Sequence, residues 1–450
     1  MAGIQAYEGN GYQAVVEMPT SIDGLETDER VVALAQRGWS YLLMKAYPAA
    51  LTDFDRVIEL KPDHVWALAG RGAAYGAMGK YMAALADLDQ AIELQPDSFG
   101  ILLVRGVLHR KMKRYSAALK DLDRAIELQP DDVWVITARG AIYFYMNRYK
   151  EALADFSRAI ELQPDGTKAI GSRGLVYLKM GKYLAALADF NRAIELKPDD
   201  AKTIMSRGLA RLAVGEYLAA LADFDRTIEL RPEYASAIAH RGQAYRLMGC
   251  YEEALIDLDR AIELNPDDAW AITIQGVTYR QMGRYGDALA DFSHAIELDP
   301  DAAWVIALRG VTCRLMERYD DALADFDRAI ELKPDDDWYF YNRALTFEMM
   351  GQGDRAQADL TAAIQYARQG YEKAPRDWTN IFNLGLYHLA AGEAEEAEHL
   401  CKEALSGGAS PNSIHDAICE LDDFLVLFPD HPHACAMRDL LQEHLQEAEQ

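Results

Sequence analysis

The sequence predicts an all-α fold, a solenoid of stacked helical hairpins, and two observations carry this prediction. The 450-residue chain matches itself when it is shifted by 34 positions, with glycine recurring from Gly38 to Gly310 and proline from Pro62 to Pro334. Each copy also contains two stretches in which small or apolar residues recur every three or four positions, the period of one helix face. A fixed period of this length indicates repeats that stack on their neighbours and do not share one globular core.

The copy at residues 269–302 shows why each repeat should form two helices, and it sets the numbering of positions 1 to 34 within a repeat. Small or apolar residues stand at positions 4, 8 and 11 in its first half and at positions 20, 24, 27 and 28 in its second half. Met282 and Gly283 interrupt the pattern, and Asp299 and Pro300 end it, because proline cannot continue a helix interior. Each repeat is therefore expected to form a helix-turn-helix hairpin.

Small residues at fixed positions explain why the pattern repeats so strictly. Glycine at position 8 and alanine at position 20 let the paired helices approach closely, and phenylalanine or leucine at position 24 fills the space beside them. With mostly tyrosine at position 11, mostly alanine at position 27 and proline at position 32, the copies resemble the tetratricopeptide repeat family. The resemblance implies a right-handed superhelical solenoid that serves as an interaction scaffold, and it does not specify the partner.

The order of segments follows from where the pattern starts, weakens and ends. In the tenth repeat Arg368 replaces the expected proline, so the second helix should continue to about Glu372. The expected segments are an acidic leader, ten repeats, a linker extension with a degenerate eleventh repeat, and two C-terminal capping helices, at residues 1–30, 31–370, 371–411 and 412–450.

The overall composition argues against several classes of partner. Acidic residues outnumber basic ones by 72 to 46, a net charge of −26, which disfavours nonspecific binding to nucleic acid or to an anionic membrane surface. The five cysteines are widely spaced without a CxxC pair, which is typical of reduced thiols in a cytoplasmic protein. No apolar run is long enough for a membrane span or a signal peptide. We therefore expect a cytoplasmic protein with no membrane partner.

Most charged residues belong to the repeated framework. Position 23 is aspartate in all ten copies, and position 7 is arginine in nine, with Gln275 as the exception. Elements repeated in every copy cannot distinguish one site from another. We therefore predict a structural ladder of arginine and aspartate within or between the hairpins.

Candidate binding residues lie where the repeats differ. Positions 2, 5, 6, 9, 12 and 13 lie away from the hairpin core, and the resemblance places this face in a concave groove; across ten copies it carries eight basic residues and one acid, Glu348. The basic residues are Arg110, Lys111, Lys168, Lys179, Lys202, Arg246, Arg280 and Arg314. The same face carries aromatic residues, of which we select Trp270, Trp304, Trp338, Phe144 and Tyr145.

Two interpretations of these residues stand side by side. Arginine forks bind carboxylates bidentately and tryptophan offers flat apolar area, so the face could bind an acidic peptide or protein segment. In that case Arg246, Arg280 and Arg314, one repeat apart at position 12, should be accessible, and reversing their charges should hardly change stability. Alternatively, the tryptophans pack on the preceding hairpins and the arginines pair with neighbouring acids.

Catalytic chemistry is not indicated. The chain contains no glycine-rich phosphate loop, no GxSxG and no HExxH motif, so we predict a protein that is not an enzyme and needs no cofactor. A zinc site can be imagined at the C-terminal end, but the spacing matches no familiar finger, and ordinary surface residues are the preferred interpretation. The residues concerned are His415, Cys419, His431, His433 and Cys435.

The resulting functional prediction is a non-catalytic scaffold or adaptor that binds an acidic peptide or protein segment. One alternative is a regulatory or chaperone subunit of an enzyme complex. A less favoured alternative is a protein that binds single-stranded nucleic acid through its basic groove. The sequence makes no prediction of the oligomeric state.

Overall fold

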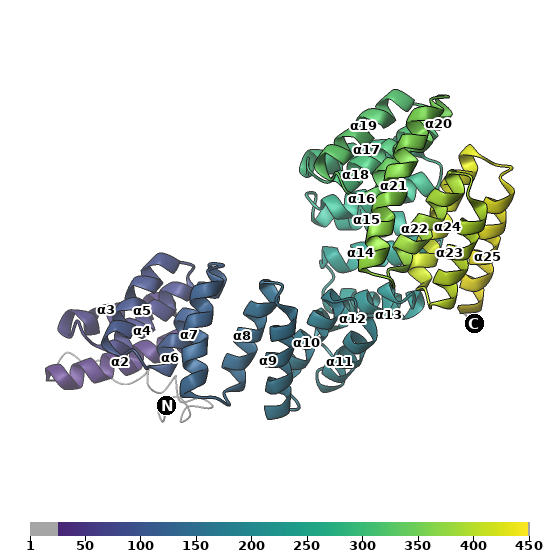
Figure 1. Cartoon of the computed structure of the whole chain (residues 1–450). Coiled ribbons are helices and arrows are strands. Elements are labelled where there is room, and N and C mark those ends of the chain that lie inside the picture. Colours follow the sequence, from purple (N-terminus) through teal and green to yellow (C-terminus); the bar gives the residue numbers. More distant parts are fainter. Residues whose placement is uncertain (1–25, 449–450) are drawn as a thin grey trace. The chain divides into compact units, whose positions relative to one another are not determined.

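A computed structural model describes residues 26–448, and this part of the chain is all-α, with consecutive helices packed as antiparallel hairpins (Figure 1). The predicted fold class, an all-α solenoid of stacked hairpins, is confirmed. The chain divides into two compact units, Met1–Lys182 and Tyr183–Gln450. Most of the predicted leader, residues 1–25, lies outside the described residues, and the first described helix begins at Thr27.

In the first unit the described helices follow one another with short turns. They are α2 (Thr27–Leu43), α3 (Tyr47–Leu60), α4 (Val65–Ala77), α5 (Tyr81–Leu94), α6 (Phe99–Lys111), α7 (Tyr115–Leu128), α8 (Val133–Tyr145), α9 (Tyr149–Leu162) and α10 (Thr167–Lys179).

The second unit continues the repeats and adds the C-terminal helices. It holds α11 (Tyr183–Leu196), α12 (Ala201–Ala213), α13 (Tyr217–Leu230), α14 (Ala235–Leu247), α15 (Tyr251–Leu264), α16 (Ala269–Gln281), α17 (Tyr285–Leu298), α18 (Ala303–Leu315), α19 (Tyr319–Leu332), α20 (Asp337–Met349), α21 (Gly353–Lys373), α22 (Trp378–Ala390), α23 (Ala394–Ser406), α24 (Pro411–Leu427) and α25 (Pro432–Ala448). As the missing proline predicts, α21 continues to Lys373.

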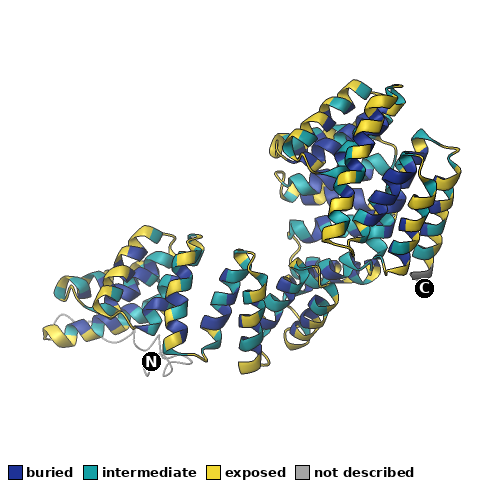
Figure 2. Cartoon of the chain, viewed as in Figure 1, coloured by how far each residue is buried: buried dark blue, intermediate teal, exposed yellow. Residues whose placement is uncertain are grey.

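Close approach of a glycine to a large side chain sets the geometry of each hairpin. A Cβ atom added to Gly276 of α16 would lie only 2.8 Å from Cε1 of Phe292 in α17. Phe292 and Ala288 are fully buried, and buried residues lie mainly on the facing sides of the paired helices (Figure 2). A side chain at position 8 would therefore force the two helices apart.

The turn between the paired helices is tight. Gly283 has a φ of 72°, in the left-handed region, and its N–H donates to the carbonyl of Arg280 at 3.0 Å. The next amide, that of Arg284, donates to the carbonyl of Tyr279 at 2.9 Å. These bonds satisfy carbonyls that the end of α16 would otherwise leave free.

The predicted arginine–aspartate ladder is confirmed, and it links neighbouring hairpins. Arg241 donates from Nε and Nη2 to both oxygens of Asp257, at 2.7 and 2.6 Å, within its own hairpin. Its Nη1 donates to Asp225 of the preceding hairpin at 2.7 Å. One guanidinium therefore joins two repeats. The intra-hairpin pairs are Arg37–Asp53, Arg71–Asp87, Arg105–Asp121, Arg139–Asp155, Arg207–Asp223, Arg241–Asp257, Arg309–Asp325 and Arg343–Asp359.

Gln275 breaks this ladder at one place. Its Nε2 donates to Asp259 of the preceding hairpin at 2.6 Å, so only the link between repeats is kept. Oδ2 of Asp291 is buried without a hydrogen-bond partner among the described residues. Burial raises the pKa of Asp291 to about 7, and the nearby carboxylates Asp259 and Asp287 add to the shift.

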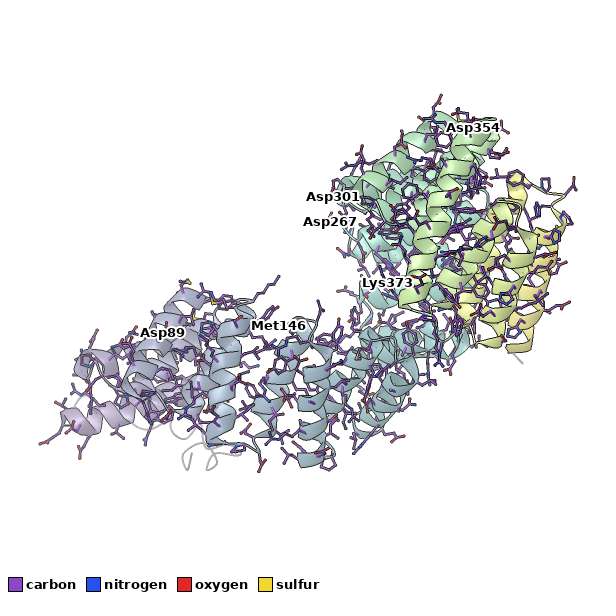
Figure 3. All side chains as sticks on the ribbon, in the orientation of Figure 1. Asp89, Met146, Asp267, Asp301, Asp354 and Lys373 are labelled. Carbon is purple, nitrogen blue, oxygen red and sulfur yellow. The ribbon has the colours of Figure 1, made fainter. Side chains whose placement is uncertain are left out.

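Exposed acids follow the turns between hairpins. Asp267 and Asp301, one repeat apart, lie at the same edge of the second unit (Figure 3), and both are exposed. This edge carries part of the large negative charge of the chain in a solvated position.

We predict that Gly276→Leu destabilises the α16–α17 hairpin by about 1 to 3 kcal/mol, because the side chain overlaps Phe292. Hydrogen exchange of these two helices measures the loss of protection. Gly286→Leu is the matched control, since no atom lies within 4 Å of a Cβ at that position in α17. Equal exchange in the two variants would contradict the role given to position 8.

We predict that Gln275→Arg stabilises the protein more at pH 8 than at pH 5. The pKa of Asp291 is raised from 3.8 to about 7, so the folded state retains a proton that the unfolded chain releases, and stability falls as the pH rises across this interval. An arginine would pair with Asp291 and remove this loss, a gain on the order of 1 kcal/mol for a partly exposed pair.

Urea denaturation at both pH values tests this prediction. Gln275→Met is the control, because it supplies no charge and should give no gain at pH 8. A gain from Gln275→Arg that is the same at both pH values would show that Asp291 is not the group responsible.

Candidate functional site

The basic residues selected in the first unit lie on two helices, α6 and α10, which flank α8. Arg110 and Lys111 end α6, and Lys168 and Lys179 begin and end α10. Lys111, Lys168 and Lys179 are exposed, and Arg110 is half-buried. None of the four forms an ion pair with another described residue, although Lys168 Nζ lies 5.7 Å from the ring centroid of Trp134.

An aromatic cluster lies on α8, between α6 and α10. Tyr145 is 55% exposed and stacks on Tyr115, with ring centroids 6.4 Å apart and an interplanar angle of 3°. Phe144, which is half-buried, meets Tyr145 edge to face at 5.7 Å. Together with Trp134, which is 47% exposed, these rings offer apolar area beside the cations. We call this set the basic face: Arg110, Lys111, Tyr115, Trp134, Phe144, Tyr145, Lys168 and Lys179.

The sequence interpretation had missed two residues of this face. Trp134 stands at position 2, like the three tryptophans that were selected, so the signal was present in the sequence. Tyr115 stands at a position that is tyrosine in most copies, so nothing in the repeat pattern could single it out.

In the second unit, the three position-12 arginines form a row across α14, α16 and α18, which we call the arginine row: Arg246, Arg280 and Arg314. Arg246 is 8% exposed, Arg314 is 1% exposed and the side chain of Arg280 is 11% exposed. The expectation that they are accessible and nearly neutral for stability is therefore wrong for accessibility. Helix α24, far away in the sequence, lies over the row, and Arg246 and Arg314 also bond to Gln281 and Asn342 of the following repeats.

Helix α24 contacts the arginine row through polar groups. Asp423 forms an ion pair with Nη1 of Arg280 across 143 residues of sequence. Gln281 joins the two layers, because its Nε2 lies 3.6 Å from Sγ of Cys419 and its Oε1 accepts from Nη1 of Arg246 at 3.0 Å. The alternative interpretation, in which the arginines pair with acids of this chain, thus holds for Arg280. Its partner, Asp423, lies in α24 and not in a repeat.

The beginning of α24 is fixed to the start of the second unit. Nδ2 of Asn412 donates to the carbonyl of Leu212 in α12 at 2.7 Å, and its Oδ1 accepts from the hydroxyl of Tyr217 in α13 at 2.6 Å. The apolar side of α24, including Ile414 and Leu421, belongs to one core with residues of α20 and α22, and α24 lies beside α22 (Figure 1). Helix α24 therefore crosses the inner helices of several repeats.

Electrostatic strain remains under α24. Nε of each of the three arginines in the row is buried without a hydrogen-bond partner among the described residues, and burial lowers the pKa of Arg246 and Arg314. Burial also raises the pKa of Glu420 to about 7, and Asp423 adds to this shift. Three effects oppose the rise in the pKa of Glu420: the charge of Arg280, a hydrogen bond donated by Trp338, and the charge of Arg314. The contact is thus complementary in charge and incomplete in hydrogen bonding.

The remaining selected residues lie in different environments. Lys202 of α12 is exposed, and Trp304 is 40% exposed. Trp270 stacks on His240 of the preceding repeat, with centroids 4.4 Å apart, which matches the alternative that tryptophans pack on preceding hairpins. Trp338 is half-buried and reaches Glu420 of α24.

The C-terminal histidines and cysteines form no metal-binding constellation in the described part of the chain. Nε2 of His415 lies 3.7 Å from Sγ of Cys419, and no group of three or more histidine, cysteine or acidic side chains in residues 26–448 is arranged so that it could hold a metal ion. Burial lowers the pKa of His415 to about 4 and raises that of Cys419 to about 11. Over the same residues, no helix combines the length and apolar character that a bilayer crossing requires.

Family models identify repeats along much of the chain. Models described as tetratricopeptide repeat match residues 69–133, 140–204, 235–268, 258–290 and 341–414, and one described as TPR repeat matches residues 310–351. No curated protein sequence matches the chain.

Several solved structures are similar to this chain. A tetratricopeptide repeat protein from Parabacteroides merdae is 19% identical, with a TM-score of 0.47, covering 55% of this chain and 98% of its own. Yeast Tom70 is 18% identical, with a TM-score of 0.46, covering 94% of this chain and 100% of its own. YrrB, described as a TPR protein with an unusual peptide-binding site, is 24% identical, with a TM-score of 0.34, covering 41% of this chain and 95% of its own.

We predict that Asp423→Leu destabilises the docking of α24 by about 3 to 5 kcal/mol, because it leaves the charge of Arg280 buried without its carboxylate. If the free energy of docking is smaller than this, α24 will detach from the repeats, and the measured loss of stability will equal the free energy of docking. The double variant Arg280→Met/Asp423→Leu removes both charges and should recover most of the loss.

Hydrogen exchange of α24 and a double-mutant cycle by urea denaturation measure these effects. Asp422→Leu is the control, since this neighbouring carboxylate is exposed and lies 3.7 Å from Arg438 of α25. Additive losses in the double variant would show that Arg280 and Asp423 do not stabilise each other.

Proposed function

The chain belongs to the tetratricopeptide repeat family, and we propose that it is a scaffold whose basic face, in the first unit, binds an acidic segment of a partner protein. Proteins of this family generally act as non-catalytic scaffolds for protein–protein contacts. The observation that carries the proposal is a contrast in pairing. In a chain with a net charge of −26, the four cations of the basic face have no carboxylate partner among the described residues.

The pairing of the framework arginines makes this contrast informative. Arg105 and Arg139, in the same helices as the basic face, each bind two aspartates. The cations of the basic face remain available to carboxylates of another molecule. Arg110 can bind a carboxylate bidentately, and the lysines add point charges on either side of the aromatic cluster.

The aromatic side chains indicate that the partner segment also carries apolar groups. Tyr145 and Trp134 combine large exposed area with little conformational freedom, and residues of this kind contribute most of the binding energy at protein interfaces. We therefore expect a segment in which aspartate or glutamate alternates with apolar side chains. The five cysteines are free thiols, which suits the reducing cytoplasm that we propose as its location.

Single-stranded RNA is the second candidate, because aromatic rings flanked by cations also stack on bases. The acidic body opposes this ligand over distances up to the Debye length, about 8 Å at physiological ionic strength. Whether the scaffold works as an adaptor, a regulatory subunit or a chaperone depends on the partner that it binds.

We predict that the triple variant Lys111→Glu/Lys168→Glu/Lys179→Glu weakens binding of acidic peptides about 10- to 100-fold. The estimate assumes about 0.5 to 1 kcal/mol for each exposed charge that changes from attraction to repulsion. The probes are peptides enriched from a random 12-residue library on the immobilised wild-type protein, and fluorescence anisotropy at 150 mM salt measures their affinity.

The matched control is Lys61→Glu/Lys120→Glu/Lys150→Glu, which reverses three exposed lysines of the first unit outside the basic face and changes the net charge equally. This control should bind within about threefold of wild type. Enriched peptides without acidic residues, or equal binding by both variants, would overturn the proposal. Binding of a labelled oligo(U) instead, lost in the first variant alone, would support the RNA candidate.

A further inference from the structure

We propose that α24 is a built-in ligand of the arginine row, and that its natural competitor is an acidic amphipathic helix of a partner protein. This second surface lies wholly within the second unit and does not depend on the basic face. Its occupant in the structure shows what kind of ligand it accepts. The argument rests on the charge, the hydrogen bonding and the two sides of α24.

The arginine row is built to receive carboxylates. Three guanidinium groups lie buried one repeat apart on alternate helices, and α24 lies over them with Asp423 paired to Arg280. A buried guanidinium stays charged and is costly unless a carboxylate compensates it. Within the described residues only Arg280 has an ion-pair partner, Asp423, whereas Arg246 donates to an amide oxygen and Arg314 to the carbonyl of Asn342.

Helix α24 matches the row with one side and the core with the other. Asp416, Glu420 and Asp423 follow one another at spacings of four and three residues, which places them along one edge of a helix. Ile418 and Leu421 belong to the opposite, apolar side, which packs with α20 and α22. A competitor must therefore be an amphipathic helix with carboxylates at the same spacing, the helix-in-groove mode of recognition.

Helix α24 leaves hydrogen-bond donors of the arginine row without acceptors, so a helix that supplies those acceptors would bind the row more tightly. Nε of Arg246, Arg280 and Arg314 is buried without an acceptor, and Cys419 stands where the helix faces Gln281 and Arg246. A carboxylate at this place could accept from the donors that a thiol leaves unsatisfied. A second copy of this chain would bring an identical α24 with the same defect, so the better ligand is a helix of a different protein.

Cys419 and Cys401 provide a reporter and its internal control. Cys419 lies on the side of α24 that faces Gln281, and Cys401 is buried in the α22–α23 hairpin. Burial raises the pKa of both thiols to about 11, so both should react slowly with iodoacetamide while the structure is intact. Displacement of α24 exposes Cys419 only, and unfolding of the C-terminal region exposes both.

The experiment adds a synthetic helix to the full chain and follows the alkylation of each cysteine by mass spectrometry. The probe is a peptide of residues 411–427 carrying Cys419→Glu, and the matched control peptide carries Cys419→Gln. We expect the glutamate peptide to accelerate the alkylation of Cys419 at least about tenfold without changing that of Cys401, and the glutamine peptide to act more weakly.

A tethered helix competes at an effective concentration in the millimolar range, so displacement from the wild-type chain is expected only at peptide concentrations near that range. The Asp423→Leu variant weakens the tethered ligand and should lower the peptide concentration needed at least about tenfold. In the variant Arg280→Met/Asp423→Leu, the peptide should accelerate the alkylation of Cys419 less than in Asp423→Leu, since the central cation that binds the peptide is lost. The triple lysine variant of the basic face should respond like the wild type.

Three results would overturn the proposal. The first is no acceleration at Cys419 in either the wild type or Asp423→Leu at millimolar peptide. The second is equal acceleration at Cys401, which would show unfolding. The third is a stable dimer of the wild-type chain that the peptide does not dissociate, which would identify a second copy as the occupant.

Discussion

The close contact between the glycine of position 8 and the large residue of position 24 is the constraint on which the rest depends. Gly276 and Phe292 show it, since a Cβ on the glycine would lie 2.8 Å from the ring. This contact fixes the distance between paired helices and brings position 7 over position 23. There the arginine guanidinium donates two hydrogen bonds to the aspartate and pairs with its opposite charge. The same geometry turns positions 12 and 13 away from the hairpin core.

Charges in this molecule divide according to what that geometry leaves free. Framework arginines such as Arg241 donate hydrogen bonds to two aspartates and so stabilise the stacking of repeats. The lysines of the basic face, such as Lys111, are exposed to solvent, and they cost the fold little. The arginine row is different, because α24 removes water from it and leaves Asp423 to compensate Arg280. The first set stabilises the fold, and the other two are the surfaces that we propose as binding sites for acidic partners.

The candidate site was predictable as a set of residues but not as one environment. A repeat pattern shows which positions lie off the hairpin core, and these positions include both the basic face and the arginine row. It does not show what else covers them. For that reason the sequence assigns Lys168 and Arg314 to the same face, although in the structure Lys168 is exposed and Arg314 is only 1% exposed.

By itself the sequence determined the hairpins, their order and the arginine–aspartate ladder, because each of these recurs every 34 residues and depends on contacts within or between adjacent repeats. The break of the ladder at Gln275 is visible in the sequence for the same reason, as the one departure from a strict period. Only the tertiary structure decided that α24 returns to the arginine row. Asp423 lies 143 residues from Arg280, outside the periodic region, and no repeat sets its register. Its position follows from burying an apolar side on α22 while its acidic edge meets buried cations, a match that exists only once the repeats have stacked.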